Sequence, residues 1–367
     1  MKVLLAGHYP PPHGGVSVHV AALAAGLRRA GIPCRVLNLE RTAPQSDEYL
    51  RFRSLPVLGY QLLKHTLGGW ILHTHISGHG RRGWLMALLC GGAALRGAGS
   101  VLSVHSGLTP EYLGRRGRFG RKLVRVACRL FDRVVCVSDA IREALVRLGA
   151  DPARLEVQYA FLGADRSQPA AVPHEVRAWM SGHRPIVAAT MGRQPEYGLD
   201  LLIRVIAELR ATFPGLGCIA MGSCVDAAAR QLVCAHGLEN AVLLAGDVSH
   251  RVCLQVIANA DAFLRPTLAD GDSLSVREAL ELGVPVLASD AGRRPPGTIT
   301  FRTGDLHDLR AKLLALLATP PRAAGERRRA NRPRGSGDGM AQWLDRYRRI
   351  RDRGEKTPKP CIRHARD

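Results

Sequence analysis

Two carboxylates eight positions apart, Asp270 and Glu278, lie in the most informative stretch of the sequence. Glycines at 271 and 283 mark turns on either side of an expected short helix, and a buried strand is expected at 286–288. A loop therefore delivers the first acid, and the first turns of a helix deliver the second. A helix N-terminus attracts anions through its unpaired N–H groups and its dipole. Carboxylates beside it can accept hydrogen bonds from hydroxyls, which suits a sugar attached to a nucleoside diphosphate.

This stretch resembles the acid-x7-acid signature of the retaining GT-B glycosyltransferases of family 4, also called glycosyl transferases group 1. In that family the pattern usually reads E-G-F-G-x-x-x-x-E-A-x-A-x-G-x-P-V. The matching residues here are Asp270 in place of the first Glu, then Gly271, Glu278, Ala279, Gly283, Pro285 and Val286. The alternative interpretation is an ordinary helix with a solvated acidic face.

The resemblance implies a role for each residue of the motif. Asp270 would bond the donor hexose or its anomeric region, and Glu278 would bind the ribose hydroxyls. Backbone N–H groups of Ser273 and Leu274 would hold the diphosphate. The implied reaction is front-face transfer with retention, in which the leaving phosphate oxygen helps to deprotonate the acceptor. No protein nucleophile is evident, and we expect the catalytic residues to be Asp270, Glu278 and His105.

One departure from the family pattern concerns the cations that hold the diphosphate. The family has G-R-L and then K-G after the first strand of the second domain. Here Gly192-Arg193 matches, but Tyr197-Gly198 stands in place of Lys-Gly. Arginine is suited to bidentate phosphate contact, so we expect Arg193, or a neighbour such as Arg265, to bind the donor. The missing lysine, together with Asp270, leaves open a degenerate member that binds a sugar or a partner enzyme without catalysis.

The first half of the chain carries further candidates for donor and acceptor contacts. Gly14 and Gly15 form a turn before a helix, where backbone N–H groups can approach a ligand closely, and the family has a similar turn near the donor phosphate. His105 follows an apolar strand, and the resemblance implies a histidine near the reacting sugar; alternatively it satisfies a loop carbonyl. His73 and His75 end another strand and are candidates to line the acceptor side.

The histidines do not predict a metal site. His75 and His79 stand at H-x-x-x-H spacing, but the sequence has no C-x2–4-C pair that would complete a zinc-binding pattern with them. Enzymes of the resembled family generally neutralise the leaving diphosphate with fixed cations and helix dipoles. We therefore expect neither a metal nor another cofactor beyond the nucleotide-sugar substrate.

The elements that position these residues alternate between short β-branched runs and amphipathic stretches, which indicates parallel α/β sheets. We expect an N-terminal acceptor-side domain at 1–165, a linker at 166–183 and a C-terminal donor domain at 184–318. Two Rossmann-like doubly wound domains facing a central cleft form the GT-B architecture. Open α/β sheets bind ligands beyond the carboxyl ends of their strands.

The C-terminal part of the sequence has a different composition. Residues 319–339 are rich in Pro, Arg, Gly and Ala, and are expected to be disordered. Residues 340–367 are expected to supply a helix that crosses back to the first domain, followed by a solvated tail.

Length and composition limit the class of protein. The 367 residues suffice for two domains, and a hydrophobic content of 46% supports two cores. Nine cysteines without a C-x-x-C pair favour a reducing, cytoplasmic location. We expect no signal peptide, and no membrane-spanning helix because the longest apolar run, 83–95, is shorter than the roughly 20 residues required.

The net charge of +21 calls for an explanation, which compositional bias of the genome can provide in part. The charge is nevertheless uneven, and one expected helix interleaves cations with apolar residues. Its candidate membrane-contacting residues are Arg118, Arg121, Lys122, Arg125 and Arg129. Such a helix favours peripheral attachment to an anionic membrane surface, although a solvated helix face is the alternative. Nucleic acid is a weak alternative partner because aromatic content is 5% and no nucleic-acid motif is present.

The leading prediction is a retaining hexosyltransferase. It would use a UDP- or GDP-sugar and a cell-envelope polysaccharide or lipid-linked saccharide acceptor, at the inner face of the cytoplasmic membrane. One alternative is a sugar-nucleotide 2-epimerase of the same fold, which acts without an acceptor. The other is the non-catalytic sugar-binding or partner protein.

Overall fold

The computed structural model describes residues 1–159, 171–319 and 339–356. These residues form two compact units. The first unit contains 1–9, 19–159 and 339–356, and the second contains 10–18 and 171–319. Each unit is built around its own parallel sheet, so the prediction of two Rossmann-like α/β domains is confirmed.

The first unit contains a seven-stranded parallel sheet with the order β3-β2-β1-β4-β5-β6-β7. Its strands are β1 (Val3–Gly7), β2 (Cys34–Asn38), β3 (Leu50–Arg51), β4 (Ile71–Ile76), β5 (Ser100–Val104), β6 (Arg133–Cys136) and β7 (Leu155–Val157). The strand order reverses between β1 and β4. This reversal is a topological switch point, where doubly wound sheets bind ligands.

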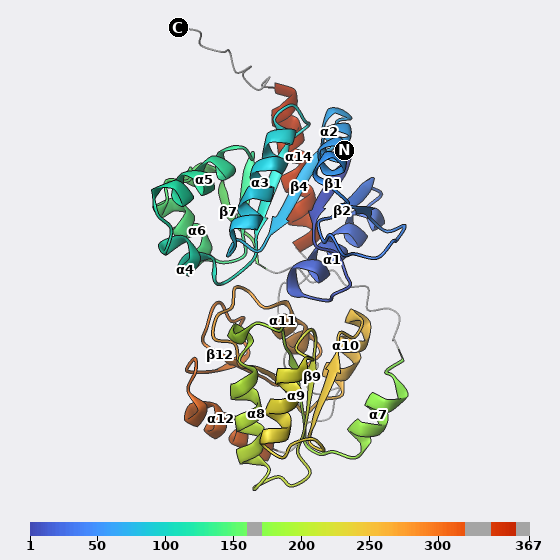
Figure 1. Cartoon of the computed structure of the whole chain (residues 1–367), viewed down its shortest axis with the longest axis vertical. Helices are drawn as coiled ribbons and strands as arrows, with labels where there is room; N and C mark the ends of the chain where they lie inside the picture. Colours follow the sequence, from blue (N-terminus) through green and yellow to red (C-terminus); the bar gives the residue numbers. More distant parts are fainter. Residues whose placement is uncertain (160–170, 320–338, 357–367) are drawn as a thin grey trace. The chain divides into compact units, whose positions relative to one another are not determined.

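Most helices of the first unit connect successive strands of its sheet (Figure 1). They are α1 (Gly15–Arg29), α2 (Leu55–Leu67), α3 (Arg81–Ala94), α4 (Thr109–Gly114), α5 (Arg118–Arg129), α6 (Asp139–Arg147), the short 3-10 turn η1 (Pro152–Arg154) and α14 (Gly339–Lys356). The sequence interpretation had not anticipated α2. Its start is set locally, since the Ser54 side chain accepts a hydrogen bond from the N–H of Val57.

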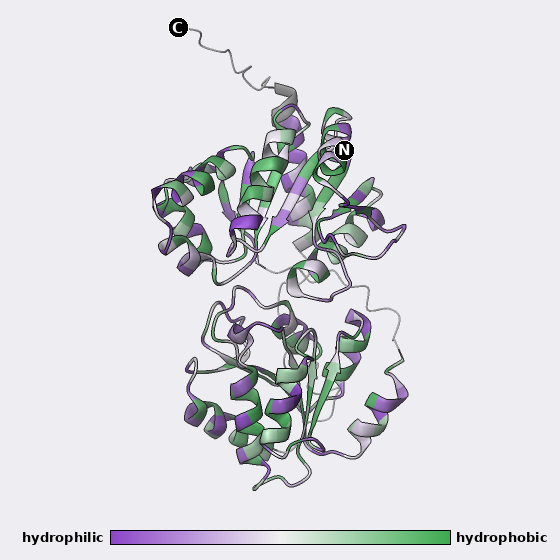
Figure 2. Ribbon diagram, viewed as in Figure 1, coloured by the Kyte–Doolittle hydropathy of each residue, from purple (hydrophilic) through white to green (hydrophobic). Residues whose placement is uncertain are grey.

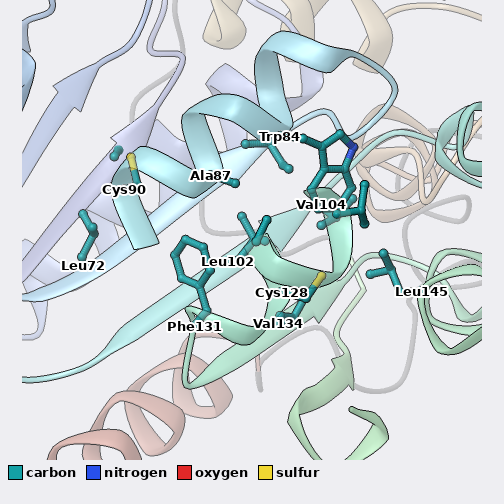
Figure 3. Packing of buried hydrophobic residues seen from close by; sticks show 14 of the residues in the cluster. Leu72, Trp84, Ala87, Cys90, Leu102, Val104, Cys128, Phe131, Val134 and Leu145 are labelled. Atoms are coloured by element: carbon teal, nitrogen blue, oxygen red, sulfur yellow. The ribbon is translucent and has the colours of Figure 1, made fainter. Parts of the chain in front are cut away.

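The core under α3 and α5 is closely packed (Figure 3). Trp84 is fully buried, and its indole N–H donates to the carbonyl of Gly78 at 2.9 Å. A Cβ on Gly91 would lie 2.7 Å from Cβ of Leu130, so only glycine permits α3 to approach this closely. The labelled side chains of this core are Leu72, Trp84, Ala87, Cys90, Leu102, Val104, Cys128, Phe131, Val134 and Leu145.

The second unit contains a six-stranded parallel sheet with the order β10-β9-β8-β11-β12-β13. Its strands are β8 (Ile186–Thr190), β9 (Gly217–Met221), β10 (Val242–Gly246), β11 (Ala262–Arg265), β12 (Val286–Ser289) and β13 (Thr298–Phe301). Its helices are α7 (His174–Ser181), η2 (Pro195–Tyr197), α8 (Leu199–Leu209), α9 (Ala227–Ala235), α10 (His250–Ala258), α11 (Leu274–Glu281) and α12 (Leu306–Ala318). Here the strand order reverses between β8 and β11.

The predicted linker at 166–183 needs correction where the structure describes it. Its part from His174 to Ser181 is helix α7, and Val176 and Met180 pack into the second unit's core beside Phe263. Two apolar residues four positions apart lie on one face of a helix, which explains the docking. The region expected to be disordered, 319–339, lies outside the described residues except for its two end positions.

Helix α14 belongs to the first unit although it ends the described chain. Trp343, Tyr347 and Ile350 are buried at helical spacing, so one face of α14 packs into the core. The phenolic oxygen of Tyr347 lies 2.6 Å from Nδ1 of His73 on β4. The helix expected after residue 339 therefore covers the strands that carry the histidines.

Candidate active site

Helix α11 begins immediately after the loop that carries Asp270. Ser273 occupies the N-cap position, but its side chain makes no capping bond and contacts the hydroxyl of Ser275 at 3.1 Å instead. The backbone N–H groups at Leu274 and in the first turn are therefore not capped by Ser273. Such a helix start is suited to an anionic group.

Glu278 projects from α11 towards α10 and is 3% exposed. Its Oε1 lies 2.6 Å from Nε2 of His250, at the start of α10. The sequence interpretation had not identified His250, because the preceding strand and loop contain no signal that links it to Glu278. The contact fixes the orientation of the carboxylate.

Asp270 is held by two arginines. Its Oδ2 accepts hydrogen bonds from Nε of Arg265 at 3.1 Å and from Nη1 of Arg294 at 3.0 Å, while its Oδ1 accepts from the N–H of Gly271 at 3.0 Å. Burial raises the pKa of Asp270, but the charges and hydrogen bonds of the two guanidinium groups outweigh it and hold the pKa below its usual value. Asp270 is therefore ionised and engaged by arginines.

The same arginines connect the carboxyl ends of three neighbouring strands. Nη1 of Arg265, the last residue of β11, donates to the carbonyl of Thr190 at the end of β8. Nε of Arg294 donates to the carbonyl of Ser289 at the end of β12. This Asp270 cluster thus lies at the switch point of the second sheet, where ligand binding is expected.

The two arginines expected to bind the donor, Arg193 and Arg265, have different environments in the structure. Arg193 is 69% exposed, and its Nε lies 3.9 Å from Asp226 rather than in the Asp270 cluster. The guanidinium of Arg265 lies over the ring of Tyr197, 4.9 Å from its centroid. Arg265, the alternative to Arg193 as a substitute for the missing lysine, therefore contacts Tyr197, the residue at the lysine position. Arg294 was not identified as a site residue from the sequence. Its position shortly after β12, at the carboxyl end of a strand, is the one signal that points to it.

Gly14 and Gly15 lie at the junction of β1 and α1. The N–H of Gly14 donates to the hydroxyl of Ser17 at 2.8 Å, and α1 begins at Gly15. A Cβ at Gly14 would meet only that hydroxyl, at 3.9 Å, and one at Gly15 would meet no described atom within 4 Å. The two glycines thus leave the backbone of this turn accessible.

The histidines of the first unit gather at the carboxyl ends of β4 and β5. Nδ1 of His75 lies 3.1 Å from Nε2 of His105, and the ring of His19 on α1 lies 5.1 Å from that of His105. Burial lowers the pKa of His19 to about 4 and those of His75 and His105 well below the ordinary value. All three imidazoles are therefore neutral at pH 7. His19 was not identified as a site residue from the sequence, because nothing in the sequence around it distinguishes it from the other positions of α1.

His73 has a different environment from the other histidines. It is fully buried, with Nδ1 bonded to Tyr347 and Nε2 lying 2.8 Å from the hydroxyl of Ser103. Because both ring nitrogens have protein partners, this arrangement favours a structural role over contact with an acceptor. His75 is also buried, whereas His105 is partly exposed.

The predicted basic helix is α5, and the structure adds an apolar surface next to it. Four of the five named cations are exposed, and Arg125 is half-buried. Helices α2 and α3 pack against each other, and α3 packs against α5. Helix α2 is hydrophobic over most of its length (Figure 2). We define the apolar face as the exposed side chains Leu55, Val57, Tyr60, Leu63 and Leu67 of α2 with Leu85 and Leu89 of α3.

The three helices that form and flank this apolar face carry charges of one sign. Helices α2, α3 and α5 contain no Asp or Glu. Their basic residues are Lys64, Arg81, Arg82, Arg118, Arg121, Lys122, Arg125 and Arg129. Among the helices that the structure describes, none is long and apolar enough to cross a bilayer.

Known proteins match the chain at the level of sequence. The curated relatives include the phosphatidylinositol N-acetylglucosaminyltransferase GPI3 subunit of Saccharomyces cerevisiae (strain YJM789), 26% identical over 76% of this chain and 59% of its own length. They also include the GDP-mannose-dependent alpha-(1-6)-phosphatidylinositol monomannoside mannosyltransferase of Mycolicibacterium smegmatis, 30% identical over 39% of this chain and 41% of its own. The chain thus spans about three fifths of the first protein and two fifths of the second.

Solved structures show the same fold. Sucrose-phosphate synthase from Thermosynechococcus elongatus aligns with a TM-score of 0.70 at 19% identity, covering 95% of this chain and 99% of that one. HepE of Anabaena, in complex with UDP-glucose, aligns with a TM-score of 0.67 at 16% identity, covering 97% and 100%.

Two family profiles match the chain in succession. Residues 13–162 match Glycosyltransferase Family 4, and residues 184–319 match Glycosyl transferases group 1. The first match runs from the loop after β1 to beyond β7. The second covers the unit that contains Asp270 and Glu278. With both halves matched in order, the chain belongs to the family 4 glycosyltransferases of the GT-B type.

Proposed function

We propose that the protein is a retaining hexosyltransferase that uses a UDP- or GDP-sugar and glycosylates a lipid-linked saccharide or cell-envelope polysaccharide. The observation that supports this most is the arrangement of the second unit. The uncapped start of α11, the buried Glu278 and the Asp270 cluster are all built on or next to the carboxyl ends of β8, β11 and β12.

On the donor side, the first N–H groups of α11 hold the diphosphate. Arg265 and Arg294 carry two positive charges against the single carboxylate of Asp270, so the cluster retains positive charge for the phosphates. Glu278 binds the ribose hydroxyls through Oε2, since Oε1 is bonded to His250. Asp270 acts as a positioning residue that holds the two guanidinium groups.

The transfer proceeds on the front face of the sugar. The C–O bond between the anomeric carbon and the diphosphate breaks, the acceptor oxygen bonds to the same face, and the acceptor proton moves to the leaving phosphate oxygen. Fixed cations and the α11 dipole stabilise the negative charge on the diphosphate, so this reaction uses no divalent metal. His105 contributes on the acceptor side of the first unit.

The choice of substrates is supported by the names of relatives. The GPI3 subunit and the mycobacterial mannosyltransferase are both named for phosphatidylinositol-based acceptors, and the second is named for GDP-mannose. HepE was solved with UDP-glucose. These names favour a nucleotide-activated hexose and an acceptor that carries a lipid.

We also propose that the protein acts in the cytoplasm as a peripheral protein at an anionic membrane surface. The apolar face would enter the interface between headgroups and acyl chains, while cations of α5 and α3 contact lipid phosphates. Each cation near an anionic surface contributes about 1 kcal/mol. A symmetric pair of protein copies would bring cations against cations, so charge favours lipid over self-association.

The test of transfer is a thermal-shift screen of the purified protein against UDP-, GDP- and ADP-sugars, with Glu278→Ala beside wild type. Stabilisation by one nucleotide class that is lost in the variant supports the donor site. Glu208→Ala, a partly exposed residue on α8 of the same unit, should respond as wild type does. Stabilisation by no nucleotide sugar would favour the non-catalytic alternative. Nucleotide release without an acceptor would favour the 2-epimerase alternative.

A further inference from the structure

Three histidines from separate elements meet in the first unit. His19 comes from α1, His75 from β4 and His105 from the residue after β5. One ring nitrogen of each lies within 4.8 Å of one ring nitrogen of the other two. Since α1 follows β1, this His19–His75–His105 cluster lies at the β1/β4 switch point of the first sheet, where a bound group is expected.

The cluster contains polar atoms that lack partners. In the part of the chain that the structure describes, Nε2 of His19 and Nε2 of His75 are buried and accept or donate no hydrogen bond. A buried polar atom left unsatisfied costs about 1–3 kcal/mol, so Nε2 of His19 in particular calls for a bound partner. His75 faces His105 through its other nitrogen, Nδ1.

The chemistry of the cluster is that of a metal ligand set. An imidazole coordinates a metal ion in its neutral form, through one ring nitrogen. Ligand nitrogens about 2.1 Å from a tetrahedral zinc ion lie about 3.4 Å apart. Nδ1 of His75 and Nε2 of His105 are 3.1 Å apart, already close to that value. A ring nitrogen of His19 lies within 4.8 Å of a nitrogen of each, so the His19 side chain moves inward when the metal binds.

We propose that His19, His75 and His105 bind one Zn²⁺ ion or a similar first-row transition metal. Three imidazoles without carboxylates favour Zn²⁺, Ni²⁺ or Cu²⁺ over Mg²⁺ and Ca²⁺. His105 is partly exposed, so the fourth coordination position is open to water or to an oxygen of a ligand. His73 is adjacent but is not a ligand, because Tyr347 and Ser103 occupy both of its nitrogens.

This inference goes beyond the proposed function, and its test measures metal binding rather than transfer, although His105 has a part in both. The donor side of the transfer lies in the second unit, and the metal site lies wholly in the first. The sequence had not predicted the site because the three ligands are separated by 56 and 30 positions (75 − 19 and 105 − 75) rather than by a zinc-binding spacing.

The test uses the full chain without an affinity tag, stripped with a chelator. Zn²⁺ is titrated against a chromophoric competitor at pH 7.5, and Co²⁺ binding is followed by visible absorption. We expect one equivalent of metal per chain and a Co²⁺ spectrum of tetrahedral or five-coordinate type. His19→Gln and His105→Gln should each weaken Zn²⁺ binding at least 100-fold. His65→Gln, another buried histidine of the same unit that lies outside the cluster, should bind as wild type does.

Two outcomes would overturn the proposal. One is the absence of stoichiometric Zn²⁺ and Co²⁺ binding, which would leave buried water as the partner of the free nitrogens. The other is metal binding that is unchanged in His19→Gln and His105→Gln, which would mean that histidines on the surface bind the metal. If a variant does not fold, X-ray absorption of the wild-type Zn²⁺ complex decides, since fewer than three imidazole ligands would contradict the site.

Discussion

Arg294 and Asp270 form an ion pair 3.0 Å long in which 6% and 11% of the side chains are exposed, although 24 positions separate them. Arg265 contacts the same carboxylate oxygen at 3.1 Å. One carboxylate thus balances two arginines that would otherwise repel each other. This is why Asp270 matters for stability as well as for the donor site.

We expect Asp270→Ala to reduce the free energy of unfolding by about 3–5 kcal/mol, because it leaves two buried guanidinium groups without a counter-charge. Urea denaturation measures the change. Glu143→Ala, which removes the exposed partner of Arg147, should change the same quantity by less than about 0.5 kcal/mol. Equal effects of the two substitutions would contradict the role given to the buried pair.

The contact between His250 and Glu278 should affect donor binding. Removing a hydrogen bond to a charged group costs about 1.5 kcal/mol or more, so we expect His250→Ala to raise the Kd of the preferred nucleotide sugar roughly tenfold. Calorimetry measures the Kd. His236→Ala, on the exposed end of α9, is the matched control and should leave it unchanged. An unchanged Kd in His250→Ala would show that Glu278 needs no positioning.

The buried histidines predict that the metal-free protein loses stability in mild acid. Burial lowers the pKa values of His19, His73, His75 and His105 in the folded chain, so the unfolded chain binds more protons below pH 6.5. The free energy of unfolding therefore falls as the pH falls from 6.5 towards about 4, the folded pKa of His19. Each histidine contributes up to about 1.4 kcal/mol per pH unit.

The measurement is urea denaturation at several pH values between 7 and 5 in the presence of a chelator. His105→Gln removes one titrating group and should make the pH dependence shallower. Ser181→Ala, an exposed substitution in the second unit that removes no titrating group, should leave the slope as in wild type. A stability that is flat across this pH range would mean that the histidines are solvated.

The packing of α14 against the first unit can be tested by removing one hydroxyl group. Tyr347→Phe removes the hydroxyl that contacts His73 and leaves the buried Nδ1 of His73 without its partner. We expect a loss of about 1–3 kcal/mol in the free energy of unfolding. Tyr60→Phe, at an exposed position on α2, should be neutral. A neutral Tyr347→Phe would show that this contact does not secure the helix.

Membrane binding should depend on both the cations and the apolar face. We expect wild type to sediment with vesicles of phosphatidylcholine and phosphatidylglycerol. Arg121→Glu with Lys122→Glu should weaken binding at least about 30-fold, since each cation contributes about 1 kcal/mol. Leu63→Asp should weaken it as well, because the side chain would no longer enter the interface.

The control for membrane binding is Arg302→Glu, an exposed charge reversal in the second unit. It should leave vesicle binding unchanged. A decrease equal to that of the α5 variant would indicate a response to net charge alone. Failure of wild type to bind anionic vesicles would leave the apolar face for an acidic protein partner.

Much of the fold followed from local sequence patterns. Alternating apolar runs and amphipathic stretches predicted both parallel sheets, and the glycines around Asp270 and Glu278 predicted the loop and the helix α11 between them. Helix α2 escaped prediction because apolar residues occupy its outer face as well as its inner face, which removes the helical periodicity. Helix α7 escaped because it follows a proline- and alanine-rich stretch that is typical of linkers.

The sequence by itself determined the family motif, the two-domain organisation and the position of a helix start between the two carboxylates, since these depend on residues a few positions apart. Only the tertiary structure decided which side chains those elements bring together. His250 with Glu278, Arg294 with Asp270, and Tyr347 with His73 are separated by 28, 24 and 274 positions. Such partners meet because particular strands and helices pack side by side. Which elements become neighbours depends on the burial of whole apolar faces and not on the local spacing of residues.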